Sequence, residues 1–140
     1  MGKSRYEPLV KLKKKSLDNA ERALIGANNA LSSASDKLNS AYEYLSHMTL
    51  PTHGSVREFS QVTALIQAQH LSIEQCQHTL QAAQLKQVQM REHFKQAMID
   101  YEKFKYLEVQ EMNAQIKALK NQEAKMLDEI GTMIYKREIL

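Results

Sequence analysis

Apolar side chains recur at alternating steps of three and four residues along the first third of the chain. The positions are Leu17, Ala20, Leu24, Ala27, Leu31, Ala34, Leu38, Ala41, Leu45 and Met48. Because 43% of all residues are apolar, ten such positions in one register arise by chance about twice in ten thousand trials. This spacing is a heptad seam, which predicts an α-helix packed against another helix. Leucine and alanine alternate, and the small alanines leave room for large side chains from the facing helix.

Helix start and stop signals divide the chain into two segments. The spacing S-x-x-E, typical of a capping box, occurs at residues 4–7 and again at 55–58. Pro8 falls in the first turn of the first segment, where its missing N–H costs little. Pro51 disfavours a helical residue before it, and Gly54 follows in a turn.

These signals predict a single all-α domain over residues 1–140, with helices at about 5–49 and 56–137. The linker, at about 50–55, is short enough to make the two helices antiparallel neighbours. We therefore expect an antiparallel two-helix coiled-coil hairpin with a longer, overhanging C-terminal helix.

The second helix carries a seam of its own, which two glutamines interrupt. It reads Val62, Ile66, Gln69, Ile73, Cys76, Leu80, Ala83, Gln87, Met90, Phe94, Ala97 and Tyr101. Polar seam residues weaken a coiled coil but can fix its register. After Tyr101 the phase slips, and the apolar stripe resumes at Val109, Met112, Ile116, Leu119, Met126, Ile130 and Met133. A slip of this kind locally unwinds a left-handed supercoil.

The helix lengths leave the end of the second helix without an intramolecular partner. With a linker of about six residues, residue i is expected opposite roughly residue 105 − i, so that the first helix ends near Tyr101. The apolar residues expected to be uncovered are Phe104, Leu107, Met112, Ile116, Leu119, Leu127, Ile130 and Ile134. Soluble proteins rarely leave such a stripe in water, so either a second copy or another partner must cover it.

Charge is concentrated at the N-terminal end. The net charge is +3 overall, and the first fifteen residues hold six basic residues against one acidic residue. A solvated helix start explains this cluster, and contact with an acidic protein surface or anionic lipid is the alternative. Residues 16–100 hold six basic and eight acidic residues, which argues against a nucleic-acid-binding arm.

The residue pattern offers no enzyme chemistry. The five histidines lack the spacing of a helical metal pair, Cys76 lies on the seam without an activating charge cluster, and no glycine-rich phosphate loop occurs. We therefore expect no catalytic residue, no cofactor and no metal. Without an apolar run of about 18 residues, a cytoplasmic protein is the default expectation.

Short motifs at both ends resemble the FliJ family, the small coiled-coil component of the flagellar type III protein export apparatus. The N-terminal match is YEPLVKLKKK, with Tyr6, Leu9 and Leu12. The C-terminal matches are YEKFKYLEVQ and NQEAKMLDEI, and a weaker one is Ile73-Glu74-Gln75. Length and hairpin layout agree over nearly the whole chain.

The resemblance implies a non-enzymatic, central-stalk-like protein for bacterial flagellum biogenesis and motility. Its partners would be the hexameric flagellar export ATPase, the cytoplasmic domain of the export gate and the export chaperones, and not nucleic acid. It would lie in the cytoplasm, peripherally associated with the inner membrane at the flagellar base. The expected partner-binding residues are Lys11, Lys13, Lys14, Lys15, Leu65, Phe104, Met112, Ile116, Leu119, Glu123, Leu127, Asp128 and Glu129.

Two alternatives to the flagellar stalk stay open at this point. The sequence barely separates a flagellar stalk protein from the corresponding protein of a virulence injectisome. A structural coiled-coil homodimer or adaptor would also cover the apolar stripe, so homo-oligomerisation of the isolated protein is a further possibility. A prefoldin-like holdase is disfavoured because the short linker cannot supply strands.

Overall fold

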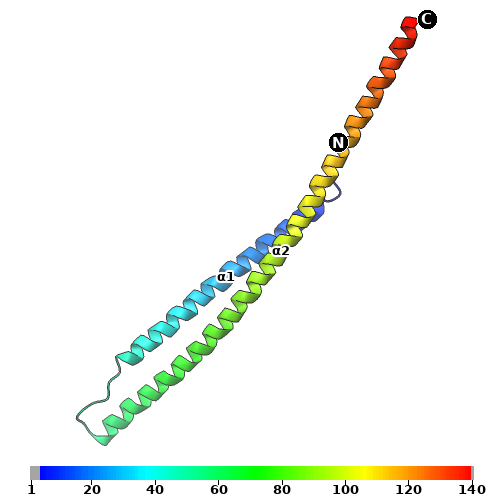
Figure 1. The fold of residues 1–140 in the computed structure, drawn as a ribbon. Helices are drawn as coiled ribbons and strands as arrows, with labels where there is room; N and C mark the ends of the chain where they lie inside the picture. The colour runs from blue at the N-terminus through cyan, green and yellow to red at the C-terminus, as the bar shows by residue number, and fades with distance from the viewer. Residues whose placement is uncertain (1–3, 140) are drawn as a thin grey trace. The chain divides into compact units, whose positions relative to one another are not determined.

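Two long helices make up the computed structural model, which describes residues 4–139. Helix α1 runs over Glu7–Ser46 and helix α2 over Val56–Ile139, and the described residues form no strand (Figure 1). This confirms the predicted all-α helical hairpin.

The first turn of α1 is capped by Ser4. Its hydroxyl oxygen accepts a hydrogen bond from the backbone N–H of Tyr6 at 3.2 Å, and its carbonyl accepts one from the N–H of Glu7 at 3.1 Å. Glu7 does not complete the reciprocal capping box, because its carboxylate lies 3.4 Å from the ammonium of Lys11 one turn later. Side-chain capping therefore replaces the backbone partners that a helix start lacks.

The linker covers residues 47–55 and is longer than expected because α1 stops at Ser46, three residues before the predicted end. The Ser46 hydroxyl donates to the carbonyl of Glu43 at 2.6 Å, and the N–H groups of His47 and Met48 bond carbonyls only three residues back. Such tightened bonding ends the helix. Gly54 has φ of 151°, a conformation that other residues rarely adopt. Ser55 then caps α2, its hydroxyl accepting the N–H of Glu58 at 3.2 Å.

The contacts divide the chain into two units. Unit 1 contains Met1–Leu17 and Ala97–Leu140, and unit 2 contains Asp18–Gln96. In each unit a part of α1 packs antiparallel to a part of α2 (Figure 1).

The core of both units is the narrow seam that the heptad pattern predicts. The buried apolar residues are Val10, Leu17, Ala20, Ala27, Ala34, Ala41 and Ile73. The twelve seam positions predicted on α2, from Val62 to Tyr101, are all buried or half-buried. The chain exposes 11291 Å² in all, whereas a compact globular protein of 16.1 kDa exposes about 7,400 Å². Little apolar surface is therefore removed from water, and each seam contact contributes a large share of the stability.

The register of the helix pair differs from the predicted one by about ten residues. In unit 2 the side-chain amide of Gln69 donates to the carbonyl of Ala41, and that of Gln87 to Asn28. Together with the contacts of unit 1, these pairs place residue i opposite roughly residue 115 − i, not 105 − i. The linker accounts for the difference. From the end of α1 it continues past the first turns of α2 before it reaches the start of that helix, so these turns have no part of α1 beside them (Figure 1).

Candidate partner-binding surface

The lysines at the start of α1 lie against aromatic rings of α2 within unit 1. The ammonium of Lys13 sits 5.6 Å from the ring centre of Phe104, and that of Lys14 sits 5.7 Å from the ring centre of Tyr101. Both distances fit cation–π attraction, which also lets the lysine stems cover the rings. Lys15 is exposed. In the basic cluster, Lys13 is half-buried and Lys14 is exposed while each lies near a ring of α2, and the exposed Lys15 is available to a partner.

Glu111 marks the last contact between α1 and α2 in unit 1. Its carboxylate accepts a hydrogen bond from the Ser4 hydroxyl at 3.0 Å and lies 3.7 Å from the Arg5 guanidinium. The half-buried positions on α2 continue to this point in unchanged heptad phase, through Tyr101, Phe104 and Glu108. The predicted phase slip thus does not disturb the side of α2 that contacts α1.

The prediction that the uncovered part begins after Tyr101 is therefore wrong. Phe104 and Leu107 were expected to be uncovered, yet both are half-buried. The shift in register places the first turns of α1 against them. The part of α2 without cover begins at Met112, about three turns later than predicted.

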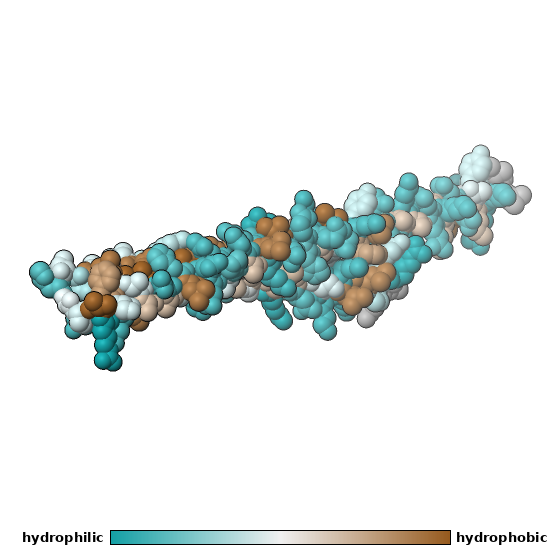
Figure 2. Space-filling view, turned by 90° about the horizontal axis from the view of Figure 1, so that it is seen from below, coloured by the Kyte–Doolittle hydropathy of each residue, from teal (hydrophilic) through white to brown (hydrophobic). Residues whose placement is uncertain are grey.

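From Met112 onward α2 is a single helix whose residues 112–138 are all exposed. We call this part the uncovered segment. Its apolar stripe is 39–68% exposed and consists of Met112, Ile116, Leu119, Met126, Leu127, Ile130, Met133 and Ile134. On the face drawn in Figure 2, hydrophobic residues form separate clusters among hydrophilic ones. At 1.5 Å per residue the uncovered segment is about 40 Å long.

Charges of both signs accompany the stripe. Glu123, Asp128 and Glu129, which were predicted to bind a partner, are all exposed on this segment. Residues 112–138 contain five basic and four acidic residues, so that the segment is nearly neutral. Recognition of this surface therefore depends on its apolar stripe and on the placement of charges rather than on net charge.

Leu65 belongs to unit 2, where it lies on the first turns of α2 beyond the end of α1. Its side chain is 61% exposed, and Val56 and Phe59 on the same turns are exposed as well. The other predicted binding residues all lie in unit 1. The candidate residues thus form two separate sets, one in each unit.

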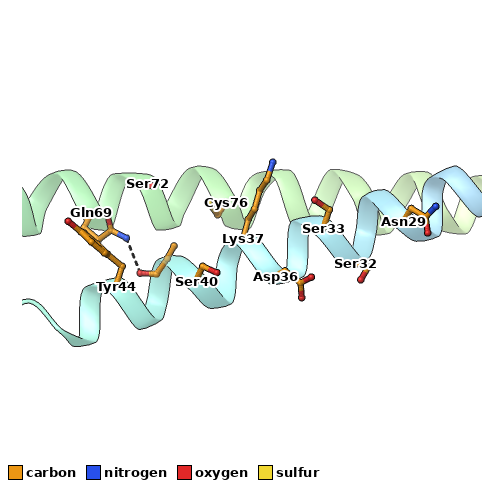
Figure 3. Close-up of a pocket in the computed structure, with 11 residues that line it drawn as sticks. Asn29, Ser32, Ser33, Asp36, Lys37, Ser40, Tyr44, Gln69, Ser72 and Cys76 are labelled. Carbon is orange, nitrogen blue, oxygen red and sulfur yellow. Dashed lines mark hydrogen bonds between the residues drawn. The ribbon is translucent and has the colours of Figure 1, made fainter.

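An open groove between the helices of unit 2 has a volume of about 770 Å³. Small polar side chains line it, among them Ser33, Ser40 and Ser72, together with Cys76 (Figure 3). Figure 3 also shows Gln69 reaching across to the carbonyl of Ala41, while the Lys37 side chain extends from α1 across α2. The groove is a loosely packed part of the seam, and Asp36 and Lys37 are the charged residues of its lining.

Among residues 4–139 there is no group of three His, Cys, Asp or Glu side chains placed to hold a metal ion. No helix in the described part of the chain is long and apolar enough to cross a membrane.

Sequence reasoning missed the role of Glu111 and of Ser4 as its partner. The S-x-x-E spacing identified Ser4 as a cap, but nothing in the pattern pointed to a partner 107 residues away. The predicted residue list also left out Met126, Ile130 and Met133, although the stripe itself had been recognised. Heptad position was the signal that could have added them.

Comparison with known proteins gives one family and no individual relative. Neither the search of curated proteins nor that of solved structures gave a significant match. The family model described as flagellar FliJ protein matches residues 2–139, nearly the whole chain. The chain thus belongs to the FliJ family, the non-catalytic coiled-coil components of flagellar type III protein export.

Proposed function

We propose that this protein acts as the central stalk of the flagellar export ATPase, with the uncovered segment inserted into the ATPase ring. The observation that carries the proposal is the stripe on residues 112–138, which no described residue of the chain covers. A helix of about 40 Å with an exposed apolar stripe, interrupted at Glu123, needs a partner surface, and a ring that surrounds it would supply one.

The physical character of the segment suits a stalk. A stalk has to stabilise a ring without locking it in one orientation. Exposed methionines and leucines spread over several turns provide moderate and adaptable contacts rather than one deep anchor. Lys15, about three turns before the uncovered segment in unit 1, adds an exposed positive charge for an acidic surface of the ring.

Truncation after Asn121 tests the proposal. The shortened chain keeps every described contact of α1 with α2, because the last of these involves Glu111. We expect circular dichroism to show a folded hairpin, while stimulation of ATP hydrolysis by the purified export ATPase falls to the basal rate. A truncated chain that stimulates hydrolysis fully would contradict the proposal and favour a homodimer or adaptor.

A matched pair of charge reversals tests the basic turns. Lys15→Glu and Lys37→Glu both change an exposed lysine of α1 and lower the net charge equally, but they lie in different units. We expect Lys15→Glu to weaken ATPase stimulation several-fold, with the Lys37→Glu variant close to the parent. Equal effects of the two variants would show that only overall charge matters.

The proposal also includes contact with the cytoplasmic domain of the export gate and with export chaperones, in the cytoplasm at the flagellar base. Leu65 and the neighbouring exposed turns of α2 are the candidate gate contact, because α1 leaves them uncovered. We expect Leu65→Ala to reduce capture of the purified gate domain by about tenfold and to leave ATPase stimulation unchanged. Unchanged capture would exclude this residue from the gate contact.

A further inference from the structure

The seam of unit 2 repeats every seven residues on both helices. The hydrogen bonds of Gln69 and Gln87 set the observed register, and Figure 3 shows Cys76 facing the part of α1 between Lys37 and Ser40. In this register each leucine of α1 lies level with a small, polar or flexible residue of α2, and each alanine of α1 lies level with a longer one. The pairs are Leu24–Met90, Leu31–Ala83, Leu38–Cys76, Leu45–Gln69, Ala20–Phe94, Ala27–Gln87, Ala34–Leu80 and Ala41–Ile73.

A slide of one heptad preserves this match of large against small residues. If α1 moves seven residues toward the start of α2, Leu31 comes level with Cys76 and Leu38 with Gln69, while the alanines again meet large side chains. The new alanine pairs are Ala27–Leu80, Ala34–Ile73 and Ala41–Ile66. Packing of large against small residues therefore does not distinguish the two registers.

Polar positions beside the seam also repeat every seven residues. Gln87 donates to Asn28 at 3.1 Å and Gln77 donates to the Tyr42 hydroxyl at 2.6 Å. Seven residues earlier on α1 stand Glu21, whose carboxylate can accept the bond of Gln87, and Ser35, whose side chain is too short to reach Gln77 as Tyr42 does. A slide by one heptad thus keeps a protein partner for the Gln87 amide and leaves the exposed Gln77 amide to pair with water.

The linker permits the slide in one direction. In the observed register Ser46 lies level with about Ala68, roughly 18 Å along α2 from Val56. After the slide Ser46 lies level with about Gln61, only about 8 Å from Val56. Nine linker residues can span about 30 Å, so the slide gives the linker slack.

What favours the observed register lies in unit 1. The contacts of Ser4 with Glu111 and of Lys13 with Phe104 have no equivalent one heptad away, whereas Lys14 would exchange the ring of Tyr101 for that of Phe94. Each is a single, partly exposed contact of the kind that contributes little stability. After the slide the uncovered part of α2 would begin at about Lys105, seven residues before Met112.

We propose that the hairpin is a register switch, in which α1 slides along α2 by one heptad between the observed register and one seven residues nearer the linker. The two registers have equivalent seam packing, and the weak contacts at the start of α1 bias the equilibrium toward the observed one. The switch concerns the chain alone and does not depend on the proposed stalk function.

The native Cys76 makes the test direct, because single substitutions on α1 report each register. In the observed register the thiol introduced by Leu38→Cys lies level with Cys76, and in the slid register the thiol introduced by Leu31→Cys does. Leu24→Cys is the matched control. Its thiol would lie level with Cys76 only after a slide of two heptads, which would carry the end of α1 past the start of α2. A disulfide needs Cα atoms within about 7 Å, whereas one heptad is about 10 Å.

The measurement is the rate of intramolecular disulfide formation in dilute protein in a glutathione redox buffer. We expect Leu38→Cys to oxidise fastest, and Leu31→Cys to be slower but about tenfold or more above Leu24→Cys, in proportion to the population of the slid register. Equal rates for Leu31→Cys and Leu24→Cys would overturn the proposal. A failure of Leu38→Cys to oxidise would overturn the register on which it rests.

A second variant separates sliding from local unfolding. The double variant Ala27→Leu/Gln87→Ala places the large residue on α1 and the small one on α2. In the observed register these two positions are level, so a large residue still packs against a small one. After a slide, the new leucine at position 27 would meet Leu80 and the register would be blocked. We expect this background to reduce Leu31→Cys oxidation to the rate of Leu24→Cys and to leave Leu38→Cys unchanged. If Leu31→Cys oxidises as fast in this background as in the parent, its disulfide forms through local unfolding rather than through sliding, and the switch is refuted.

Discussion

Replacing Ile73 by alanine tests whether the narrow seam carries the stability of unit 2. Ile73 is only 5% exposed and is the one residue of α2 in the buried apolar core among those whose burial is described. The substitution removes three carbons, each worth about 0.8 kcal/mol when buried, which gives about 2.4 kcal/mol. The cavity term adds little, because a two-helix seam is open on both sides and its neighbours can relax into the space.

Leu71→Ala is the matched control, because it removes the same number of carbons two residues away on the same helix. Leu71 is 58% exposed, so the expected loss is below about 0.5 kcal/mol. Urea unfolding followed by circular dichroism at 222 nm measures both free energies of unfolding by linear extrapolation. We expect Ile73→Ala to lower the free energy of unfolding by about 2–3 kcal/mol. Equal losses for the two variants would refute the assignment of Ile73 to the seam.

Three further substitutions have defined expectations. Gly26→Ala should raise the free energy of unfolding by about 0.5–1 kcal/mol in the same assay, because alanine loses less backbone entropy than glycine in a helix and the added carbon meets nothing within 4 Å. A lower free energy of unfolding would contradict this expectation. Ser55→Ala should lower it by about 1 kcal/mol through loss of the cap of α2, and Ser60→Ala, without a capping role, serves as control. Glu111→Ala should accelerate amide hydrogen exchange at residues 7–11, since it removes the partner of Ser4 and Arg5; unchanged exchange would argue against that anchor.

The shift in register changes which residues are available to a partner. Phe104 was expected on the exposed stripe, yet it lies beneath Lys13, so that its substitution would disturb unit 1 as well as any interface. Met112 and Ile116 lie beyond the last α1 contact and are exposed. Mutations that address partner binding without affecting the hairpin therefore belong at Met112 and beyond.

Local sequence determined the helices and their seam. The heptad spacing of apolar residues identified the buried face of both helices, since only one side of a helix can face its neighbour. Ser55 and Pro51 marked the turn between the helices, because capping and the proline ring act within a few residues. The hairpin topology followed from two helices with one short connection.

Only the tertiary structure decided the register, and with it where the uncovered segment begins. The alternation of leucine and alanine is satisfied equally well every seven residues, so the pattern contains no preference between registers that lie seven residues apart. The choice depends on contacts between residues far apart in the chain, such as Ser4 with Glu111 and Gln87 with Asn28, and on a linker that folds back along α2. Such contacts leave no periodic signal in the sequence, because each involves a single pair of side chains.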